Sequence, residues 1–140
     1  MPAAHRAKLL WFLPALAVML AIFSLSSQQR VPTAGFNTQI VAVAGHLAAY
    51  GVLAIALLIA FEQKGLPSRK AALWAFGGSA AYGLTDEIHQ YFVPGRQADP
   101  IDLITNAIGA AVFLWVVMCM RANPAQSVGR RMLAQSRRRP

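Results

Sequence analysis

Residues 40–61 read IVAVAGHLAAYGVLAIALLIAF and contain no Asp, Glu, Lys or Arg. A helix needs about 20 consecutive apolar residues to cross the roughly 30 Å hydrocarbon core of a bilayer. This stretch meets that length, so we predict a membrane-spanning helix from Ile40 to Phe61.

Three further apolar stretches occur in the chain, at Leu9–Ser27, Ala71–Phe92 and Ile101–Met120. Of the 140 residues, 56% are hydrophobic and 13% are charged, whereas about a quarter of the residues of a soluble protein are charged. Four short spans cannot close a β-barrel, so helices are the only spanning structure open to them. We predict an all-α fold in which residues 1–122 form one domain, a four-helix transmembrane bundle.

The distribution of basic residues predicts the orientation of this bundle. The net charge is +8, and the Lys and Arg residues gather before the first stretch, between the second and third, and after the fourth. Arg30 and Arg96 alone lie in the other two loops. By the positive-inside rule, both termini are then cytoplasmic. We expect residues 123–140 to be a basic, mobile cytoplasmic tail that contacts anionic lipid headgroups rather than nucleic acid.

The first stretch has a second interpretation. A basic start, an apolar run from Leu9 to Phe23 and the small residues Ser24 and Ser26 also resemble a cleavable signal peptide. The run continues to Ser27, which is long enough to span, so we favour a retained helix.

The ionisable residues are unusually concentrated. Four of the five acidic side chains lie between Tyr82 and Asn106. Ionisable groups within a bilayer are expensive, and those present usually face a protein interior or a wet cavity. At 1.5 Å per helical residue, His46 of the second stretch, Asp86 of the third and Asp102 of the fourth reach a similar depth near the outer face.

The helical phases predict that these polar groups converge. At 100° per residue, the third stretch places one set of polar residues on a single stripe, and the fourth stretch does the same with a second set. His46 and Tyr50 share a face of the second stretch. The stripes are Ser79, Tyr82, Asp86, His89 and Gln90, and Asp102, Thr105, Asn106 and Gly109. We therefore predict an outer-face polar pocket between three helices.

Two chemistries suit such a pocket. The candidate catalytic residues are His46, Asp86, Glu87 and His89, and the candidate ligand-binding residues are Tyr50, Gln90, Arg96, Asp102 and Asn106. A divalent metal is disfavoured because no HExxH spacing occurs and Glu87 and His89 lie about 160° apart on a helix. We assign no metal and leave the cofactor open. Proton transfer by carboxylates and histidine, with Arg96 clamping a phosphate or carboxylate, is compatible with more of the residues.

Simpler roles compete with these. Asp99 before Pro100 is typical of a helix N-cap, and Asp102 then lies in the first helical turn, where the helix dipole favours it. Arg96 could neutralise Asp86, Asp99 or Asp102. Gln90 and Asn106 could form interhelical hydrogen bonds.

Several motifs, in order, resemble those of the VanZ-like membrane proteins. They are Ser26-Ser27-Gln28, Gly45-His46-Leu47-x-x-Tyr50-x-x-Leu53, Asp86-Glu87-x-His89-Gln90-x-Phe92-x-Pro94-Gly95-Arg96 and Asp102-x-x-x-Asn106-x-x-Gly109. The resemblance covers roughly residues 9–120. It implies a multi-pass protein of the bacterial cytoplasmic (inner) membrane, in a family named for a member linked to teicoplanin resistance, and it supplies no reaction.

Three functional hypotheses follow. The first is a cell-envelope protein whose outer-face pocket binds a lipid or cell-wall-related ligand and thereby affects glycopeptide susceptibility. The second is a membrane-embedded hydrolase or transferase that uses the His, Asp and Glu cluster. The third is a structural or partner-recruiting protein in which the polar seam holds the helices together. Four helices offer little room for a transport path, so transport would require an oligomer.

Overall fold

The computed structural model describes residues 9–28, 37–96 and 99–122. Within these ranges there are four long helices and no strands, which confirms the all-α prediction. They are α2 (Leu13–Ser26), α3 (Thr38–Gln63), α4 (Ser68–Tyr91) and α5 (Pro100–Ala122). The predicted tail, residues 123–140, lies outside the described residues.

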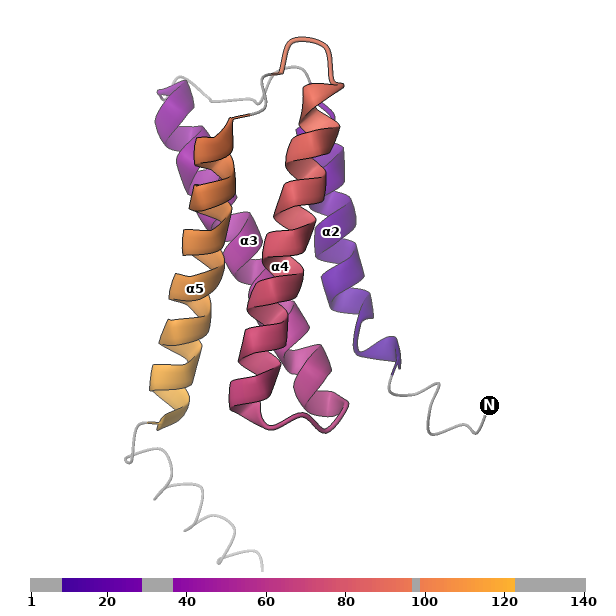
Figure 1. Ribbon diagram of the computed structural model, residues 1–140, viewed down its shortest axis with the longest axis vertical. Coiled ribbons are helices and arrows are strands. Elements are labelled where there is room, and N and C mark those ends of the chain that lie inside the picture. The colour runs from indigo at the N-terminus through magenta and orange to yellow at the C-terminus, as the bar shows by residue number, and fades with distance from the viewer. Residues whose placement is uncertain (1–8, 29–36, 97–98, 123–140) are drawn as a thin grey trace, which may run out of the picture.

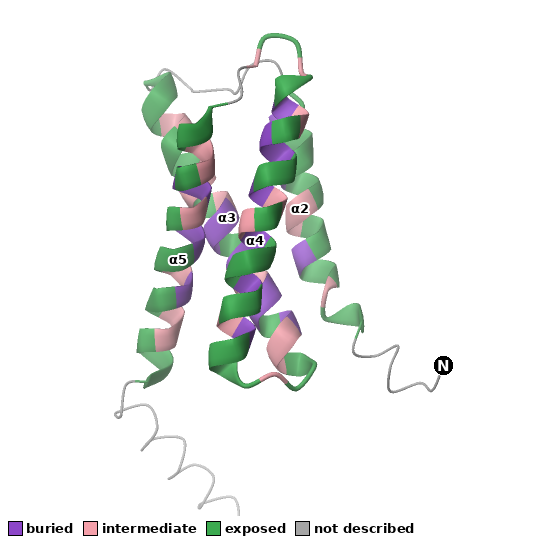
Figure 2. Ribbon diagram, in the orientation of Figure 1, coloured by how far each residue is buried: buried purple, intermediate pink, exposed green. Residues whose placement is uncertain are grey.

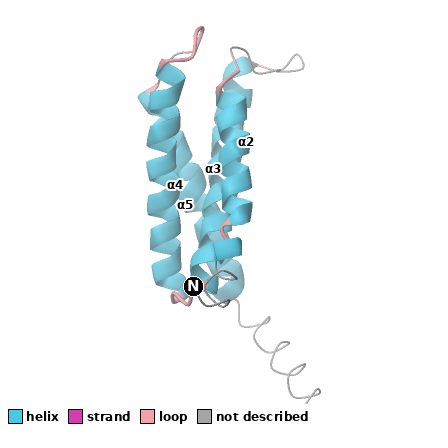
Figure 3. Ribbon diagram, turned by 90° about the vertical axis from the view of Figure 1, so that its right-hand side faces the viewer, coloured by secondary structure: helices cyan, strands magenta, loops and turns pink. Residues whose placement is uncertain are grey.

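The helices run up and down alongside one another (Figures 1 and 3), and α3 packs against α2, α4 and α5. At one end, α2 and α4 finish and α3 and α5 begin; we call it the α4–α5 end, uppermost in Figure 1. The start of α2 and the end of α5 both lie at the opposite end, beside the α3–α4 turn. The polar residues predicted on the second, third and fourth apolar stretches therefore lie toward the same end of the bundle, the α4–α5 end.

Local sequence explains where the helices stop and start. Asn37 caps α3, because its side-chain oxygen accepts from the backbone N–H of Gln39 at 2.9 Å and of Ile40 at 3.4 Å. After α4, the Arg96 N–H donates to the Val93 carbonyl at 3.1 Å, and Gly95 has a φ of 81°. Proline followed by a residue of positive φ is typical of a type II turn, so the predicted Pro94-Gly95 turn is confirmed.

The first predicted span differs from the structure. α2 begins at Leu13 rather than Leu9, because Trp11 and Phe12 form a turn and Pro14 occupies the first turn of the helix. Proline is favoured there because backbone N–H groups in the first turn have no partner within the helix, so the missing N–H of proline costs nothing. With 14 residues, α2 is about 21 Å long. It is shorter than the hydrocarbon core of a bilayer.

Two of the described helices, α3 and α5, are both long enough and apolar enough to cross a membrane. α4 has 24 residues, but its polar residues reduce its overall hydropathy. All four helices carry exposed residues, the green segments of Figure 2, and many of these are large apolar residues. Trp115 on α5 is 67% exposed and Leu73 on α4 is 73% exposed. This arrangement, with apolar groups outside, suits a lipid environment better than water.

The interior combines aliphatic and polar residues. The aliphatic part lies toward the α3–α4 turn and includes Leu53, Leu58, Ala71, Ala75, Ala110 and Leu114. The backbones of α3 and α5 come very close at Gly109, where a Cβ atom would lie 2.8 Å from the Leu47 Cα atom. Small residues permit such close helix packing in membranes. Apart from Ser79 in the middle of α4, the buried polar residues gather toward the α4–α5 end: Ser26, Asp86, Glu87, Gln90, Thr105 and Asn106.

Candidate functional site

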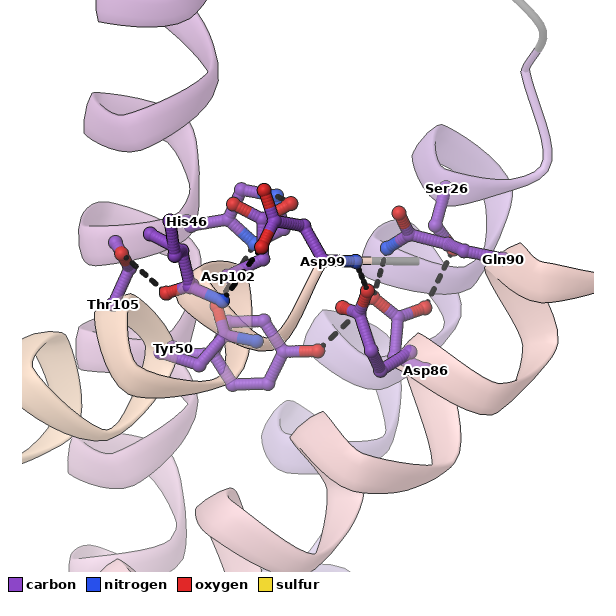
Figure 4. A network of polar contacts seen from close by, with 11 residues as sticks. Ser26, His46, Tyr50, Asp86, Gln90, Asp99, Asp102 and Thr105 are labelled. Atoms are coloured by element: carbon purple, nitrogen blue, oxygen red, sulfur yellow. Dashed lines mark hydrogen bonds and ion pairs between the residues drawn. The ribbon is translucent and has the colours of Figure 1, made fainter. Parts of the chain in front are cut away.

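Asp86 is the centre of the first polar cluster. Its carboxylate is 4% exposed and accepts three hydrogen bonds from three helices (Figure 4). Ser26 of α2 donates to Oδ1 at 2.6 Å, while Tyr50 of α3 and Gln90 of α4 each donate to Oδ2 at 3.0 Å. A buried carboxylate is costly unless its oxygens are satisfied, and here neutral donors satisfy them. We call these four residues the Asp86 cluster.

An interhelical hydrogen bond was one possible role of Gln90, but the structure shows a bond within its own helix instead. Its amide donates to Asp86 within α4, four residues earlier in the sequence. Residues four apart lie one above the other on a helix, so this contact needs no other helix. The interhelical bonds at Asp86 come instead from Ser26 and Tyr50.

Tyr50 forms hydrogen bonds through both its side chain and its backbone. It is 1% exposed, its hydroxyl reaches Asp86, and its backbone carbonyl accepts a 3.2 Å hydrogen bond from Ser79 of α4. The ring lies parallel to that of His46, with centroids 6.4 Å apart. Tyr50 thus connects the Asp86 cluster to the second polar cluster.

The second cluster joins α3 to α5 through His46. The imidazole Nδ1 lies 2.8 Å from Asn106 Oδ1, and Nε2 lies 3.5 Å from Asp102 Oδ2 (Figure 4). Asn106 therefore forms the predicted interhelical hydrogen bond. Both ring nitrogens of His46 thus face oxygen atoms of α5. We call these three residues the His46 cluster.

Glu87 and Asp99 connect the start of α5 to α4. Glu87 is buried, and its Oε1 accepts a short hydrogen bond from the Asp99 backbone N–H. The Asp99 side chain accepts from the Ile101 N–H at 2.9 Å, which confirms it as the N-cap of α5. Asp102 lies in the first turn of α5, as predicted.

His89 faces α2, away from the His46 cluster. Its Nε2 lies 3.0 Å from the Ser27 hydroxyl, and its ring stacks on Phe23 with centroids 4.4 Å apart. The four candidate catalytic residues therefore separate into different contact groups. Within residues 9–28, 37–96 and 99–122, no three His, Cys, Asp or Glu side chains are arranged to hold a metal ion.

A cavity of about 130 Å³ lies beside the Asp86 cluster, between α2, α3 and α4. Its walls are largely apolar and include Ile22 and Leu25 of α2 and Val41, Ala42 and Ala49 of α3. Its polar lining consists of Ser26, His46, Tyr50, Asp86, Gln90 and Arg96. Five of the nine residues predicted as catalytic or ligand-binding thus line one cavity: His46, Tyr50, Asp86, Gln90 and Arg96.

Arg96 was also considered as a partner for Asp86, Asp99 or Asp102. It makes no ion pair within the part of the chain that the structure describes. Its Nε atom is buried and has no hydrogen-bond partner there. The same holds for Glu87 Oε2 and Asn106 Nδ2.

The sequence motifs, the helix order and these contacts can be compared with known proteins. The sequence profile of the VanZ/LLP1 family matches residues 5–121. The chain belongs to the VanZ/LLP1 family. The match includes α2, α3, α4, all but the last residue of α5, and every residue of both polar clusters, so the resemblance in the sequence motifs is confirmed. No individual curated protein and no solved structure matches this VanZ/LLP1 chain.

Sequence reasoning did not assign Ser26 and Ser27 to the site of this VanZ/LLP1 protein. Ser26 is buried against Asp86, and Ser27 contacts His89. The available signal was their position, since they end the first apolar stretch at the depth where the third stretch ends.

Proposed function

We propose that this protein is a VanZ-like component of the bacterial cell envelope that crosses the cytoplasmic membrane four times, with both termini in the cytoplasm. Its cavity, at the outer face, binds an amphiphilic lipid or cell-wall-related ligand. One observation carries the binding proposal: the cavity between α2, α3 and α4 has apolar walls and a polar lining centred on Asp86 and Arg96. Apolar pockets with a few convergent polar groups are typical of small-molecule sites.

Two observations support the proposed topology. The start of α2 and the end of α5 lie at the same end of the bundle (Figure 1). Lys64, Arg69 and Lys70 lie at that end too, in and beside the α3–α4 turn, as expected for a cytoplasmic side. The short α2 would span by local thinning of the bilayer, which costs only a fraction of a kcal/mol per Å.

Cysteine labelling in intact cells tests the topology. Cys119 is exposed and is first replaced by serine. A cysteine at Pro94, in the α4–α5 turn, should react with an impermeant maleimide from outside, whereas one at Lys64 should react only after lysis. Labelling of the Lys64→Cys variant alone in intact cells would reverse the proposed orientation.

Ligand binding is tested by filling the cavity. Ala42 lines it, so Ala42→Phe should exclude an amphiphile, whereas Ala48→Phe places the same ring on the exposed face of α3. Native mass spectrometry of the purified protein should show lipid adducts that survive in the Ala48→Phe variant and are lost in Ala42→Phe. Equal adducts in both variants would exclude this cavity as the binding site.

A cell-wall-related ligand would connect the cavity to glycopeptide susceptibility. Cells that express the wild-type chain should then differ in teicoplanin susceptibility from cells that lack it, and Ala42→Phe should remove the difference. Ala48→Phe should retain it. If wild type and Ala42→Phe gave the same susceptibility at equal abundance, the cavity would play no part in this effect.

One contact favours the alternative of a membrane-embedded hydrolase or transferase. The Ser27 hydroxyl donates to the Phe23 carbonyl at 2.6 Å and also lies 3.0 Å from His89 Nε2, so a turn of the hydroxyl would direct its proton to the imidazole as in a nucleophile–base pair. Incubating the purified protein with lipid extracts tests this directly. Product formation by wild type that is lost in Ser27→Ala and His89→Ala would support catalysis, and no turnover of any lipid would exclude it for those substrates.

A further inference from the structure

The cavity contains a cation whose partner is not in the described chain. Arg96 is partly buried, lines the cavity, and has a buried Nε atom that lacks an acceptor among residues 9–28, 37–96 and 99–122. A buried guanidinium N–H without an acceptor is unfavourable. An acceptor supplied by a ligand in the cavity would remove that cost.

Asp86, the carboxylate that lines the same cavity, does not serve as this acceptor. Its two oxygens already accept from Ser26, Tyr50 and Gln90, and no ion pair joins it to Arg96. The negative charge of Asp86 is therefore stabilised by neutral donors. The guanidinium of Arg96 stays available to an anion from outside the chain.

The chemistry of the guanidinium narrows the class of ligand. The Nε–H and one Nη–H of arginine form a planar edge that binds two oxygens of one phosphate at once. Ile22, Leu25 and Val41 give the same cavity apolar walls. A molecule that combines a phosphate with an acyl or isoprenoid chain matches both parts, and it is the form in which phosphate occurs within a membrane.

We propose, building on the binding function proposed above, that Arg96 is the phosphate-binding residue of this cavity and that the ligand is a phosphate-bearing amphiphile. The phosphate lies against the Nε edge of Arg96, and the chain runs between α2 and α3. One acceptor site on Asp86 Oδ1 is left beside the Ser26 bond, enough for one hydroxyl donor of the headgroup.

The test compares lipids that share their acyl chains. The purified full-length protein in detergent is titrated with phosphatidylglycerol, with diacylglycerol, with oleate and with inorganic phosphate, and binding is followed by native mass spectrometry. Wild type should bind phosphatidylglycerol at least about tenfold more tightly than diacylglycerol, the usual effect of a charge-assisted hydrogen bond. Arg96→Gln should remove this preference and leave diacylglycerol binding unchanged. Arg96→Lys, which keeps the charge without the planar edge, should restore only part of it.

A matched variant separates this site from general attraction to anionic lipid. Arg69 is an exposed cation at the start of α4, outside the cavity, and Arg69→Gln changes the net charge by the same amount. It should retain the full preference for phosphatidylglycerol. An equal loss of preference in Arg69→Gln and Arg96→Gln would overturn the proposal.

The remaining outcomes are also decisive. If millimolar inorganic phosphate displaces phosphatidylglycerol, the site recognises the phosphate group alone. If it does not, the site recognises the phosphate as part of the lipid headgroup. Either result supports a phosphate site. Oleate that binds as tightly as phosphatidylglycerol would overturn phosphate recognition. Equal binding of diacylglycerol and phosphatidylglycerol to wild type would overturn it too, while the proposed lipid-binding function would stand. Absence of any adduct sensitive to Ala42→Phe would instead reject the binding function itself.

Discussion

Ser26 at the end of α2 donates a 2.6 Å hydrogen bond to the Asp86 carboxylate of α4, across 60 positions of sequence. Both side chains are almost completely buried. This contact attaches the shortest of the four helices to the polar centre of the bundle. It also explains how a carboxylate can be buried here without a cation beside it.

Removing this donor should destabilise the protein. Ser26→Ala leaves Asp86 Oδ1 buried without its hydrogen bond, which should lower the free energy of unfolding by about 1–3 kcal/mol. Ser24 offers the control, because its exposed hydroxyl bonds only to the Leu20 carbonyl of its own helix. Thermal unfolding in detergent should show a clearly reduced Tm for Ser26→Ala and almost no change in Tm for Ser24→Ala. A similar Tm for both would mean that the buried bond adds nothing to stability.

The donors to Asp86 should also act together. Tyr50→Phe keeps the buried ring and removes only the hydroxyl that donates to Oδ2. Because Ser26 and Tyr50 share one acceptor residue, the double variant should deviate from additivity by about 0.5–3 kcal/mol. A double-mutant cycle on unfolding free energies measures this coupling. Strict additivity would indicate that the two bonds form independently.

The depth of the site could be predicted from the sequence, because counting residues along apolar stretches fixes depth at 1.5 Å per residue. His46, Asp86 and Asn106 accordingly lie near one end of the bundle. Helical phase predicts which face a residue occupies but not which neighbour it meets. For this reason, the sequence predicted one pocket for His46, Asp86 and His89, whereas His46 bonds to α5 and His89 contacts α2.

Two further differences have local causes. Gln90 can reach Asp86 on its own helix, and such a bond needs no precise helix packing, so it replaces the expected interhelical one. Leu9 and Leu10 are helical, Trp11 and Phe12 form a turn, and α2 starts at Leu13, so the first predicted span is interrupted just before Pro14. Hydropathy alone does not show where a proline interrupts a helix.

A comparison of Arg96 with Asp86 distinguishes ligand binding from a purely structural role. Asp86 is the shared acceptor of three helices, so Asp86→Ala should reduce folded protein whatever the function is. Arg96→Gln removes no side-chain hydrogen bond or ion pair within the described chain, so its unfolding free energy should stay within about 0.5 kcal/mol of wild type. Membrane abundance and Tm of both variants provide the measurement. Loss of folded protein in Arg96→Gln would favour the hypothesis that the polar seam only holds the helices together.

The close approach of α3 and α5 at Gly109 yields the last prediction. A Cβ atom there would lie 2.8 Å from Leu47 Cα and 2.9 Å from its carbonyl carbon, and both are backbone atoms that cannot rotate away. Gly109→Ala should therefore push the two helices apart and destabilise the protein by about 1–3 kcal/mol, the usual cost of overpacking. The same shift would weaken the His46–Asn106 bond, because Asn106 precedes Gly109 on the same face of α5.

Gly77 of α4 is the matched control. A Cβ atom at this position meets nothing within 4 Å, so Gly77→Ala should be neutral or should stabilise by up to about 1 kcal/mol through its better helix propensity. Tm measurements in the same detergent compare the two variants directly. If Gly109→Ala were as stable as Gly77→Ala, the helices would not be packed as closely as the backbone distances require, and the His46 cluster would lose the framework that brings α3 and α5 together.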